Sequence, residues 1–166
     1  MQASIQEICA EVTIHYLEMT DSSLLRPKPS AHEDFTLQQA QIPLAELNRF
    51  LYASVGVDWS WTNRLSWTYQ QWQSWLEQFN VSTWIGYLAG TPMGYFELAF
   101  HDDNSIEIAH FGILPRFTGQ GLGGHLLTCA LEQAWYLNPK RVWLHTCSLD
   151  HPSALPNYRA RGFKLY

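Results

Sequence analysis

The stretch that decides the fold is residues 106–127, IEIAHFGILPRFTGQGLGGHLL. An apolar run typical of a strand ends at Pro115, and four glycines follow between Gly119 and Gly124, where a helical pattern begins. Each glycine at the start of a helix costs about 0.5–1 kcal/mol relative to alanine. A turn between a strand and a helix needs only one or two of them. The others indicate a ligand close to the backbone, and free N–H groups at a helix N-terminus favour an anion such as a phosphate.

The composition limits the class of protein. A chain of 166 residues has the size of one domain and can bury a core without metal or disulfides. The formal charge is −5 and the ten Lys and Arg residues are scattered, so we expect no nucleic-acid partner. Cys9, Cys129 and Cys147 cannot all pair and show no CxxC spacing, which indicates a reduced protein. With no signal peptide and no apolar run of membrane-spanning length, we expect a cytoplasmic protein without a membrane partner.

Hydrophobic periodicity predicts the order of the elements. Strands are predicted at 11–19, 35–42, 82–89, 93–100, 106–114 and 141–147, and helices at 43–56, from about 66 to 79, at 126–137 and at 151–161. In the first strand Val12, Ile14 and Tyr16 alternate with polar residues, and Gly90-Thr91-Pro92 predicts a hairpin. We therefore expect a single α/β (α+β) domain over 1–166, with a mixed, mostly antiparallel sheet and helices on both faces. Residues 1–34 would form a strand and loop extension before a core at 35–166.

A dinucleotide-binding protein is an alternative, because Gly119, Gly121 and Gly124 also match the spacing GxGxxG. Two observations weigh against it. In the dinucleotide-binding fold these glycines close the first βα turn and several further βα units follow, yet only 42 residues remain here. A Pro-Arg-Phe-Thr insert also separates Leu114 from Gly119, where the fingerprint requires an immediate turn.

Two segments, FGILPRFTGQGLGGHLL (111–127) and HPSALPNYRARGF (151–163), resemble the signatures of the GNAT superfamily of N-acetyltransferases. Gly121 and Gly123 match the small positions of the acetyl-CoA signature [Q/R]-x-x-G-x-[G/A]. The second segment resembles N-x-x-A-x-x-x-Y-x-x-x-G-F through Ala154, Tyr158, Gly162 and Phe163. The resemblance covers about residues 35–163.

The chain departs from these signatures at three positions. Thr118 replaces the Gln or Arg, His151 replaces the Asn, and Pro156 is expected to interrupt the last helix. Only three residues follow Phe163, where the family adds further strand. We expect the strand at 11–19 to complete the sheet instead, within the chain or across a homodimer.

The resemblance implies an N-acetyltransferase that uses acetyl-CoA and no metal. It implies that the amides of 119–124 hold the pyrophosphate, that 111–114 pair with the pantetheine arm and that the Ile113 N–H faces the thioester oxygen. Tyr158 matches the tyrosine that protonates the coenzyme A thiolate. The cofactor-binding candidates are Phe111, Gly112, Ile113, Leu114, Thr118, Gly119, Gln120, Gly121, Leu122, Gly123, Gly124, His151 and Ala154.

Glu107 is the predicted general base. It precedes Ile113 by six residues, the spacing of the strand glutamate in the histone-acetylating branch of the family. Even spacing places the two side chains on one face of a strand. His110 and Glu97 are the alternatives, and a purely structural role stays open for all three.

The acceptor site of the family corresponds to the Trp-rich region 57–75. Trp59 and Trp61 could bracket an amine by cation–π contact, with Asp58 fixing its charge and Glu97 as a further substrate-binding candidate. The tryptophans could equally be core. The expected acceptor is a small primary amine, or else a peptide N-terminus or lysine. A protein that binds acyl-CoA without turnover is the non-enzymatic alternative. The residues His145, Cys147, Asp150 and His151 are of metal-ligand type, but their spacing fits no zinc motif.

Overall fold

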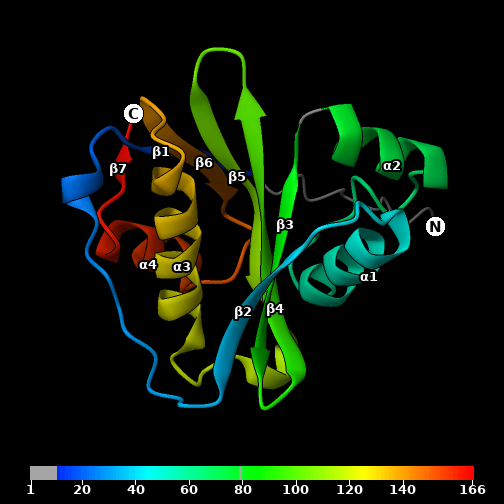
Figure 1. Cartoon of the computed structure of the whole chain (residues 1–166), viewed down its shortest axis with the longest axis horizontal. Helices are drawn as coiled ribbons and strands as arrows, with labels where there is room; N and C mark the ends of the chain where they lie inside the picture. Colours follow the sequence, from blue (N-terminus) through cyan, green and yellow to red (C-terminus); the bar gives the residue numbers. More distant parts are fainter. Residues whose placement is uncertain (1–10, 79) are drawn as a thin grey trace, which may run out of the picture.

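A computed structural model describes residues 11–78 and 80–166 and shows one seven-stranded sheet between two layers of helices (Figure 1). The strands are β1 (Ile14–Met19), β2 (Phe35–Ala40), β3 (Ser82–Leu88), β4 (Thr91–His101), β5 (Ser105–Ile113), β6 (Arg141–Cys147) and β7 (Lys164–Leu165). The helices are α1 (Ala45–Gly56), α2 (Tyr69–Gln78), α3 (Leu122–Tyr136) and α4 (Ala154–Ala160), with 3₁₀ turns η1 (Ser22–Leu24) and η2 (Pro115–Phe117). Helices α1 and α2 cover one face, and α3 and α4 cover the other. The predicted fold class is confirmed; Cys9 and Phe79 lie outside the described residues.

The strands lie in the order β2-β3-β4-β5-β6-β1-β7, and every neighbouring pair is antiparallel except β5 and β6. Strand β1 joins the sheet within the chain, between β6 and β7. The residues after Phe163 form the short edge strand β7, so the expectation that β1 replaces a strand there is wrong, because Lys164–Leu165 pairs with the free edge of β1. The turn between β3 and β4 is Ala89-Gly90, with φ values of 48° and 77°, as in a type I′ hairpin. Thr91 and Pro92, predicted as part of that turn, already belong to β4.

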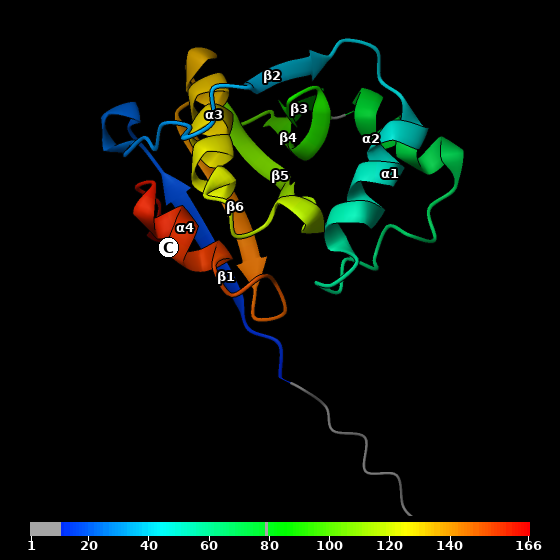
Figure 2. The same cartoon turned by 90° about the horizontal axis from the view of Figure 1, so that it is seen from below.

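Strands β5 and β6 separate soon after they meet. Their parallel pairing joins only Ser105–Glu107 to Arg141–Trp143. On the other side of β5, Glu97 is opposite His110 while Leu98 is opposite Ile108, so Ala109 is the extra residue of a β-bulge. A bulge bends its strand, and beyond this one the two strands diverge (Figure 2). The facing edges of β5 and β6 are thus left without each other as hydrogen-bond partners.

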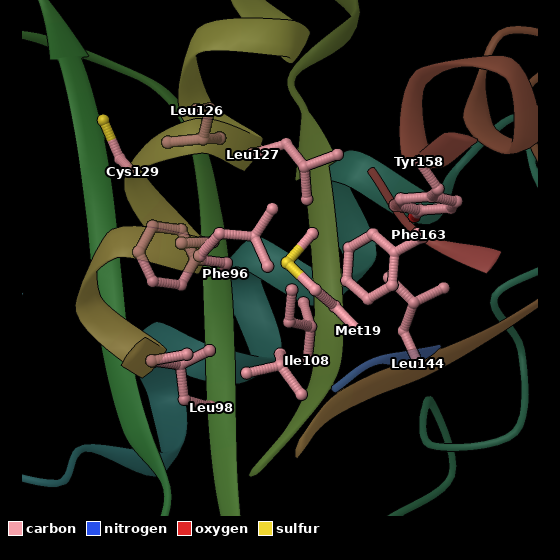
Figure 3. Packing of buried hydrophobic residues seen from close by; sticks show 14 of the residues in the cluster. Met19, Phe96, Leu98, Ile108, Leu126, Leu127, Cys129, Leu144, Tyr158 and Phe163 are labelled. Carbon is pink, nitrogen blue, oxygen red and sulfur yellow. The ribbon is translucent and has the colours of Figure 1, made fainter. Parts of the chain in front are cut away.

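Helix α3 packs its apolar side on the sheet and forms the main core (Figure 3). Leu122, Leu126, Leu127 and Leu131 are all at most 1% exposed. Burying each such side chain contributes about 1.5–3 kcal/mol. Strand β1 adds Leu17 and Met19 to this core. The alternating residues Val12, Ile14 and Tyr16 are exposed instead, because α1 packs over β4 and β5 and leaves that part of the sheet open.

Helix α4 begins at Ala154, which places Pro156 in its first turn. A proline there removes no hydrogen bond, so the expectation that it interrupts the helix is wrong. After the helix, Gly162 has φ +112°, and a Cβ at this position would lie 2.1 Å from the Leu24 carbonyl oxygen. Only glycine fits this helix end. None of the helices in the described ranges is both long and apolar enough to cross a membrane.

Candidate active site

A cavity of about 990 Å³ lies where β5 and β6 diverge. The cavity is lined by helix α1 and the loop that follows it, the bent half of β5, the turn into α3, the end of β6 and the loop after it, helix α4, and Lys28 from the loop before β2. The β5 wall is Ile108–Ile113, and the α3 wall includes Thr118, Gly119, Gly121, Leu122, Gly123 and Gly124. The remaining walls include Tyr52, Trp59, Trp61, His145, Cys147, Asp150, His151, Ala154, Asn157 and Tyr158.

The glycines of the α3 turn differ in whether the backbone or its neighbours require glycine at that position. Gly119 and Gly121 both have φ +76°, and Gly121 is the N-cap of α3. At Gly124 a Cβ would lie 2.5 Å from Arg161 Nη1 and 2.6 Å from Lys28 Cδ, so this glycine makes room for two basic side chains. At Gly123 a Cβ would meet nothing nearer than 3.8 Å. A Cβ at 123 would thus make only ordinary van der Waals contacts, so the fold does not require glycine there, and Gly123 lines the cavity.

The N-terminus of α3 is suited to an anion. No side chain caps it, so its first-turn N–H groups point outward with the positive end of the helix dipole. The loop before β2 crosses it: the Lys28 N–H donates to Thr128 Oγ1 (2.9 Å). Arg161 Nε donates to the Arg26 carbonyl (2.9 Å). Both Lys28 and Arg161 line the cavity. Lys28 comes from a Pro-rich loop a hundred residues earlier, so no local pattern could have predicted it.

Most of the predicted cofactor-binding residues line this one cavity. They are Phe111, Gly112, Ile113, Thr118, Gly119, Gly121, Leu122, Gly123, Gly124, His151 and Ala154. Leu114 and Gln120 are not part of its wall. The Leu114 N–H donates to the Met93 carbonyl (2.9 Å), and the Gln120 side chain donates to the Arg116 carbonyl (3.1 Å), so both are used by the fold.

Tyr158 lies in the cavity wall and is 7% exposed. Its ring packs edge-on against Phe111 of β5 and against Phe163. Burial, with a smaller contribution from the charge of Asp150, raises the pKa of the Tyr158 phenol. The hydroxyl is therefore protonated at neutral pH and can donate a proton inside the cavity.

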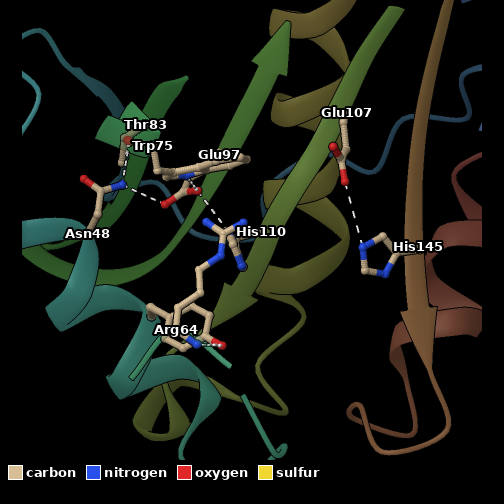
Figure 4. Close-up of polar contacts among 9 residues, drawn as sticks. Asn48, Arg64, Trp75, Thr83, Glu97, Glu107, His110 and His145 are labelled. Carbon is tan, nitrogen blue, oxygen red and sulfur yellow. Dashed lines mark hydrogen bonds and ion pairs between the residues drawn. The ribbon is translucent and has the colours of Figure 1, made fainter. Parts of the chain in front are cut away.

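A buried carboxylate lies behind the β5 wall (Figure 4). Glu97 is fully buried and accepts hydrogen bonds from Asn48 Nδ2 (2.7 Å), Trp75 Nε1 (3.0 Å) and His110 Nδ1 (2.9 Å). Burial by itself raises the pKa of Glu97, but the charge of His110 and these hydrogen bonds lower it from 4.5 to about 2. Glu97 does not reach the cavity, whereas His110 lines it.

Glu107 does not line the cavity. It also does not share a face with Ile113: the bulge at Ala109 shifts the alternation, so Ile113 packs with the α3 core while Glu107 faces the other side. The Glu107 carboxylate lies 3.0 Å from His101 Nε2 and 3.9 Å from His145 Nε2 (Figure 4). The prediction that the two residues share one face is therefore wrong.

Two tryptophans of the aromatic region line the cavity and the others do not. Trp61 donates from Nε1 to Asp150 (3.2 Å) and packs on Tyr52 and His110, while Trp59 packs on His151. These contacts join the loop after α1 to the loop after β6. Asp58, the predicted charge partner of the amine, is exposed and lies outside the wall, whereas Asp150 lies in it. In contrast, Trp72 is 1% exposed and belongs to the core.

No group of three or more metal-ligating side chains is found within residues 11–78 and 80–166. His145 is directed to Glu107, Asp150 accepts from Thr146 and the Cys147 N–H, and His151 accepts from the Ser153 N–H (3.0 Å). Cys129 and Cys147 are both free thiols.

The sequence profile of the acetyltransferase (GNAT) family matches residues 44–163. The chain therefore belongs to the GNAT family of acetyltransferases. Among curated proteins no sequence matches it. The antiparallel run from β2 to β5 also differs from the parallel sheet of dinucleotide-binding proteins, which removes the fold-level basis of that alternative.

Solved structures confirm the fold. A GCN5-related N-acetyltransferase from Kribbella flavida has a TM-score of 0.65 at 20% identity, over 93% of this chain and 56% of that one. Another from Sphaerobacter thermophilus has a TM-score of 0.70 at 16% identity, over 92% and 48%. The chain thus spans about half the length of these two proteins. An aminoglycoside acetyltransferase from an uncultured soil metagenomic sample, in complex with sisomicin, has a TM-score of 0.61 at 15% identity, over 77% and 87%.

Proposed function

We propose that the protein transfers an acetyl group from acetyl-CoA directly to a primary amine. One observation carries this proposal: a single cavity combines the uncapped N-terminus of α3, the separated edges of β5 and β6, and a buried tyrosine hydroxyl. These are the three things that a thioester donor with a phosphate-bearing carrier needs from a protein. Bound acetyl-CoA would supply the activated acetyl group.

The pyrophosphate would be held at the α3 turn. The residues present fit this group, because Gly123 has no side chain beside the free N–H groups, and the fold itself does not require a glycine at this position. Lys28 and Arg161 would add positive charge at the same end of the cavity. This positive charge would compensate for the absence of the Gln or Arg of the family signature, which Thr118 replaces. The unpaired edge of β5 at 111–113 would hydrogen-bond the amide groups of the pantetheine arm.

Tyr158 would act as the acid that protonates the leaving sulfur. Burial keeps the proton on the phenol at neutral pH, and the hydroxyl would pass it to sulfur as the carbon–sulfur bond breaks. The edge-on contacts with Phe111 and Phe163 restrict the ring of Tyr158.

The acceptor would enter at the end lined by Trp59, Trp61 and Tyr52. Among the described residues of the cavity wall Asp150 is the one carboxylate, and Lys28 and Arg161 lie at the α3 end. An amine with one positive charge and an apolar or aromatic body suits this surface, by cation–π contact and charge. The aminoglycoside enzyme of the same fold supports a small molecule over a peptide as acceptor. The cytoplasmic location stays a prediction.

Calorimetric titration with acetyl-CoA tests this function, with NADH as a second ligand. We expect micromolar binding of acetyl-CoA and none of NADH. Gly123→Glu should abolish binding without unfolding the protein, because its side chain enters the open space where the phosphates would lie. Gln38→Glu is the matched control. It adds the same charge at an exposed position of the edge strand β2, which lies three positions from β5 in the order of the sheet.

Failure of the wild-type protein to bind acetyl-CoA would contradict the proposal. Binding without release of free thiol in the presence of any primary amine would instead favour the non-catalytic acyl-CoA-binding alternative.

A further inference from the structure

We propose that His110 is the residue that takes a proton from the acceptor amine, and that Glu97 and Arg64 hold it ready to do so. The proposal rests on the acetyltransferase function above. It assigns the base to a side chain in the cavity wall instead of Glu107, which lies outside that wall.

The geometry selects one tautomer of His110. An ionised carboxylate can only accept hydrogen bonds, so the 2.9 Å contact between Glu97 Oε2 and His110 Nδ1 places the proton on Nδ1. In the neutral ring the lone pair is then on Nε2. The side chain is 12% exposed and belongs to the cavity wall. Packing against Tyr52 and Trp61, at centroid distances of 5.2 and 5.4 Å, restricts the ring.

Arg64 supplies a positive charge near the Glu97 carboxylate, which His110 would otherwise have to carry. A buried carboxylate needs a positive partner, and a histidine that always carries the charge could not accept a proton. The Arg64 guanidinium lies over Trp75 (4.0 Å) and Trp67 (4.5 Å) and interacts electrostatically with Glu97. Within the described part of the chain its buried Nη1 has no hydrogen-bond partner. Since arginine stays charged in proteins, the charge of Glu97 is compensated while His110 is neutral.

The other described titratable groups near Glu97 and His110 do not place a second anion beside the His110 ring. Burial raises the pKa of both Tyr52 on α1 and Tyr95 on β4, so both phenols are neutral at physiological pH. Glu107 and His145, on β5 and β6, form their own cluster beyond the bulge. Glu97 is therefore the one anion in hydrogen-bond contact with the His110 ring among the described residues.

The proton balance is complete with these groups. His110 Nε2 takes one proton from the ammonium group, which frees the nitrogen lone pair, and passes this proton to solvent. The nitrogen then bonds to the acetyl carbon, the carbon–sulfur bond breaks, and Tyr158 gives its proton to the leaving sulfur. The second proton of the nitrogen returns to the Tyr158 phenolate, so the protein regains its starting state and one proton is released.

Nitrogen-15 NMR of the histidine rings tests the positioning without any substrate. We expect His110 of the wild-type protein to carry its proton on Nδ1, whereas free histidine favours Nε2. In Glu97→Leu no oxygen remains to accept from Nδ1, so this preference should be lost. A wild-type His110 with its proton on Nε2 would overturn the proposal.

Turnover of acetyl-CoA with 2-phenylethylamine, a primary amine with an aromatic body, tests the chemical role. His110→Gln should lower kcat by about 100-fold or more and remove the rise of rate with pH, while the Kd for acetyl-CoA stays within about twofold. His101→Gln is the matched control, because His101 is a histidine of β4 outside the cavity wall. This variant should keep the wild-type kcat and the wild-type rise of rate with pH. Full activity of His110→Gln with an unchanged pH profile would overturn the proposal. Failure of the proposed function would be seen separately, as no binding of acetyl-CoA by the wild type.

Discussion

Two carboxylate–histidine contacts lie in the same sheet, and their surroundings differ. Glu97 is fully buried, accepts from three donors and meets His110 at 2.9 Å. Glu107 is 13% exposed and contacts His101 and His145, whose side chains are 34% and 52% exposed. Figure 4 shows its contact with His145. The residue types are the same, so they cannot decide which pair is poised for proton transfer. The burial of the carboxylate and the number of hydrogen-bond donors fixed around it decide which pair is poised. They determine the charge of the carboxylate and the tautomer of the histidine.

The bulge at Ala109 lies between the two pairs along β5. Because it adds one residue, Glu107 and His110, which are three positions apart, lie on the same face of the sheet: Glu97 is opposite His110, and Ala99 is opposite Glu107. The two pairs differ in what covers that face, since His110 packs against Tyr52 of α1 and lines the cavity while Glu107 faces His145 of β6.

The largest expected effect is on stability. Glu97→Ala removes the acceptor of three buried donors and leaves Arg64 without its counter-charge, so we expect a loss of about 3–5 kcal/mol in the free energy of unfolding. Glu107→Ala removes contacts with His101 and His145, whose side chains are 34% and 52% exposed, so it should cost less, about 1 kcal/mol. Urea denaturation followed by circular dichroism measures both. Equal losses in the two variants would remove the basis of the comparison.

A second expected effect is the pH dependence of stability. The pKa of Glu97 falls from 4.5 to about 2 on folding, so between these values the unfolded chain binds the proton and the folded chain does not. Stability is therefore fully present above about pH 4.5 and is lost as the pH falls toward 2, by up to about 3 kcal/mol.

Urea denaturation at several pH values measures this loss. Glu97→Gln should lose less than the wild type over the same interval, while Glu107→Gln should follow the wild type. If the wild type and Glu97→Gln lost stability in parallel, Glu97 would not be ionised in the folded protein.

The smallest expected effect is that of Glu107 on turnover. Since Glu107 lies outside the cavity wall, Glu107→Gln should change kcat with acetyl-CoA and 2-phenylethylamine by less than about threefold. The steady-state rate of thiol release measures it. A loss of about 100-fold would restore Glu107 as the base and contradict the assignment of His110.

Local patterns in the sequence were enough to predict the order of the strands and helices, apart from the short strand β7. That the α3 turn holds a phosphate group stays a prediction. Residues 106–127 carry a strand, a turn and a helix in succession, and each signal is local. Most of the predicted cofactor-binding residues share one cavity for the same reason, because they lie on two continuous segments. Alternation in 11–19 predicted a strand correctly, although the exposed face is the one with Val12, Ile14 and Tyr16.

The sequence could not show what depends on packing between distant segments. An extra residue in a strand reverses its faces, and no pattern in IEIAHFGI marks Ala109 as that residue. Lys28 reaches α3, and Asp150 instead of Asp58 meets Trp61, only through the tertiary fold. The same holds for Arg64, which reaches Glu97 from a loop after α1.

A crystal structure of the wild-type protein with coenzyme A tests the central claim most directly. We predict the pyrophosphate at the N-terminus of α3 beside Gly123, with Lys28 and Arg161 in contact with phosphate oxygens. The pantetheine arm should lie along β5 between the diverging strands, and its sulfur should lie near Tyr158 and on the His110 side of the cavity. Coenzyme A bound elsewhere on the molecule, with the α3 turn and the gap between β5 and β6 vacant, would contradict the account.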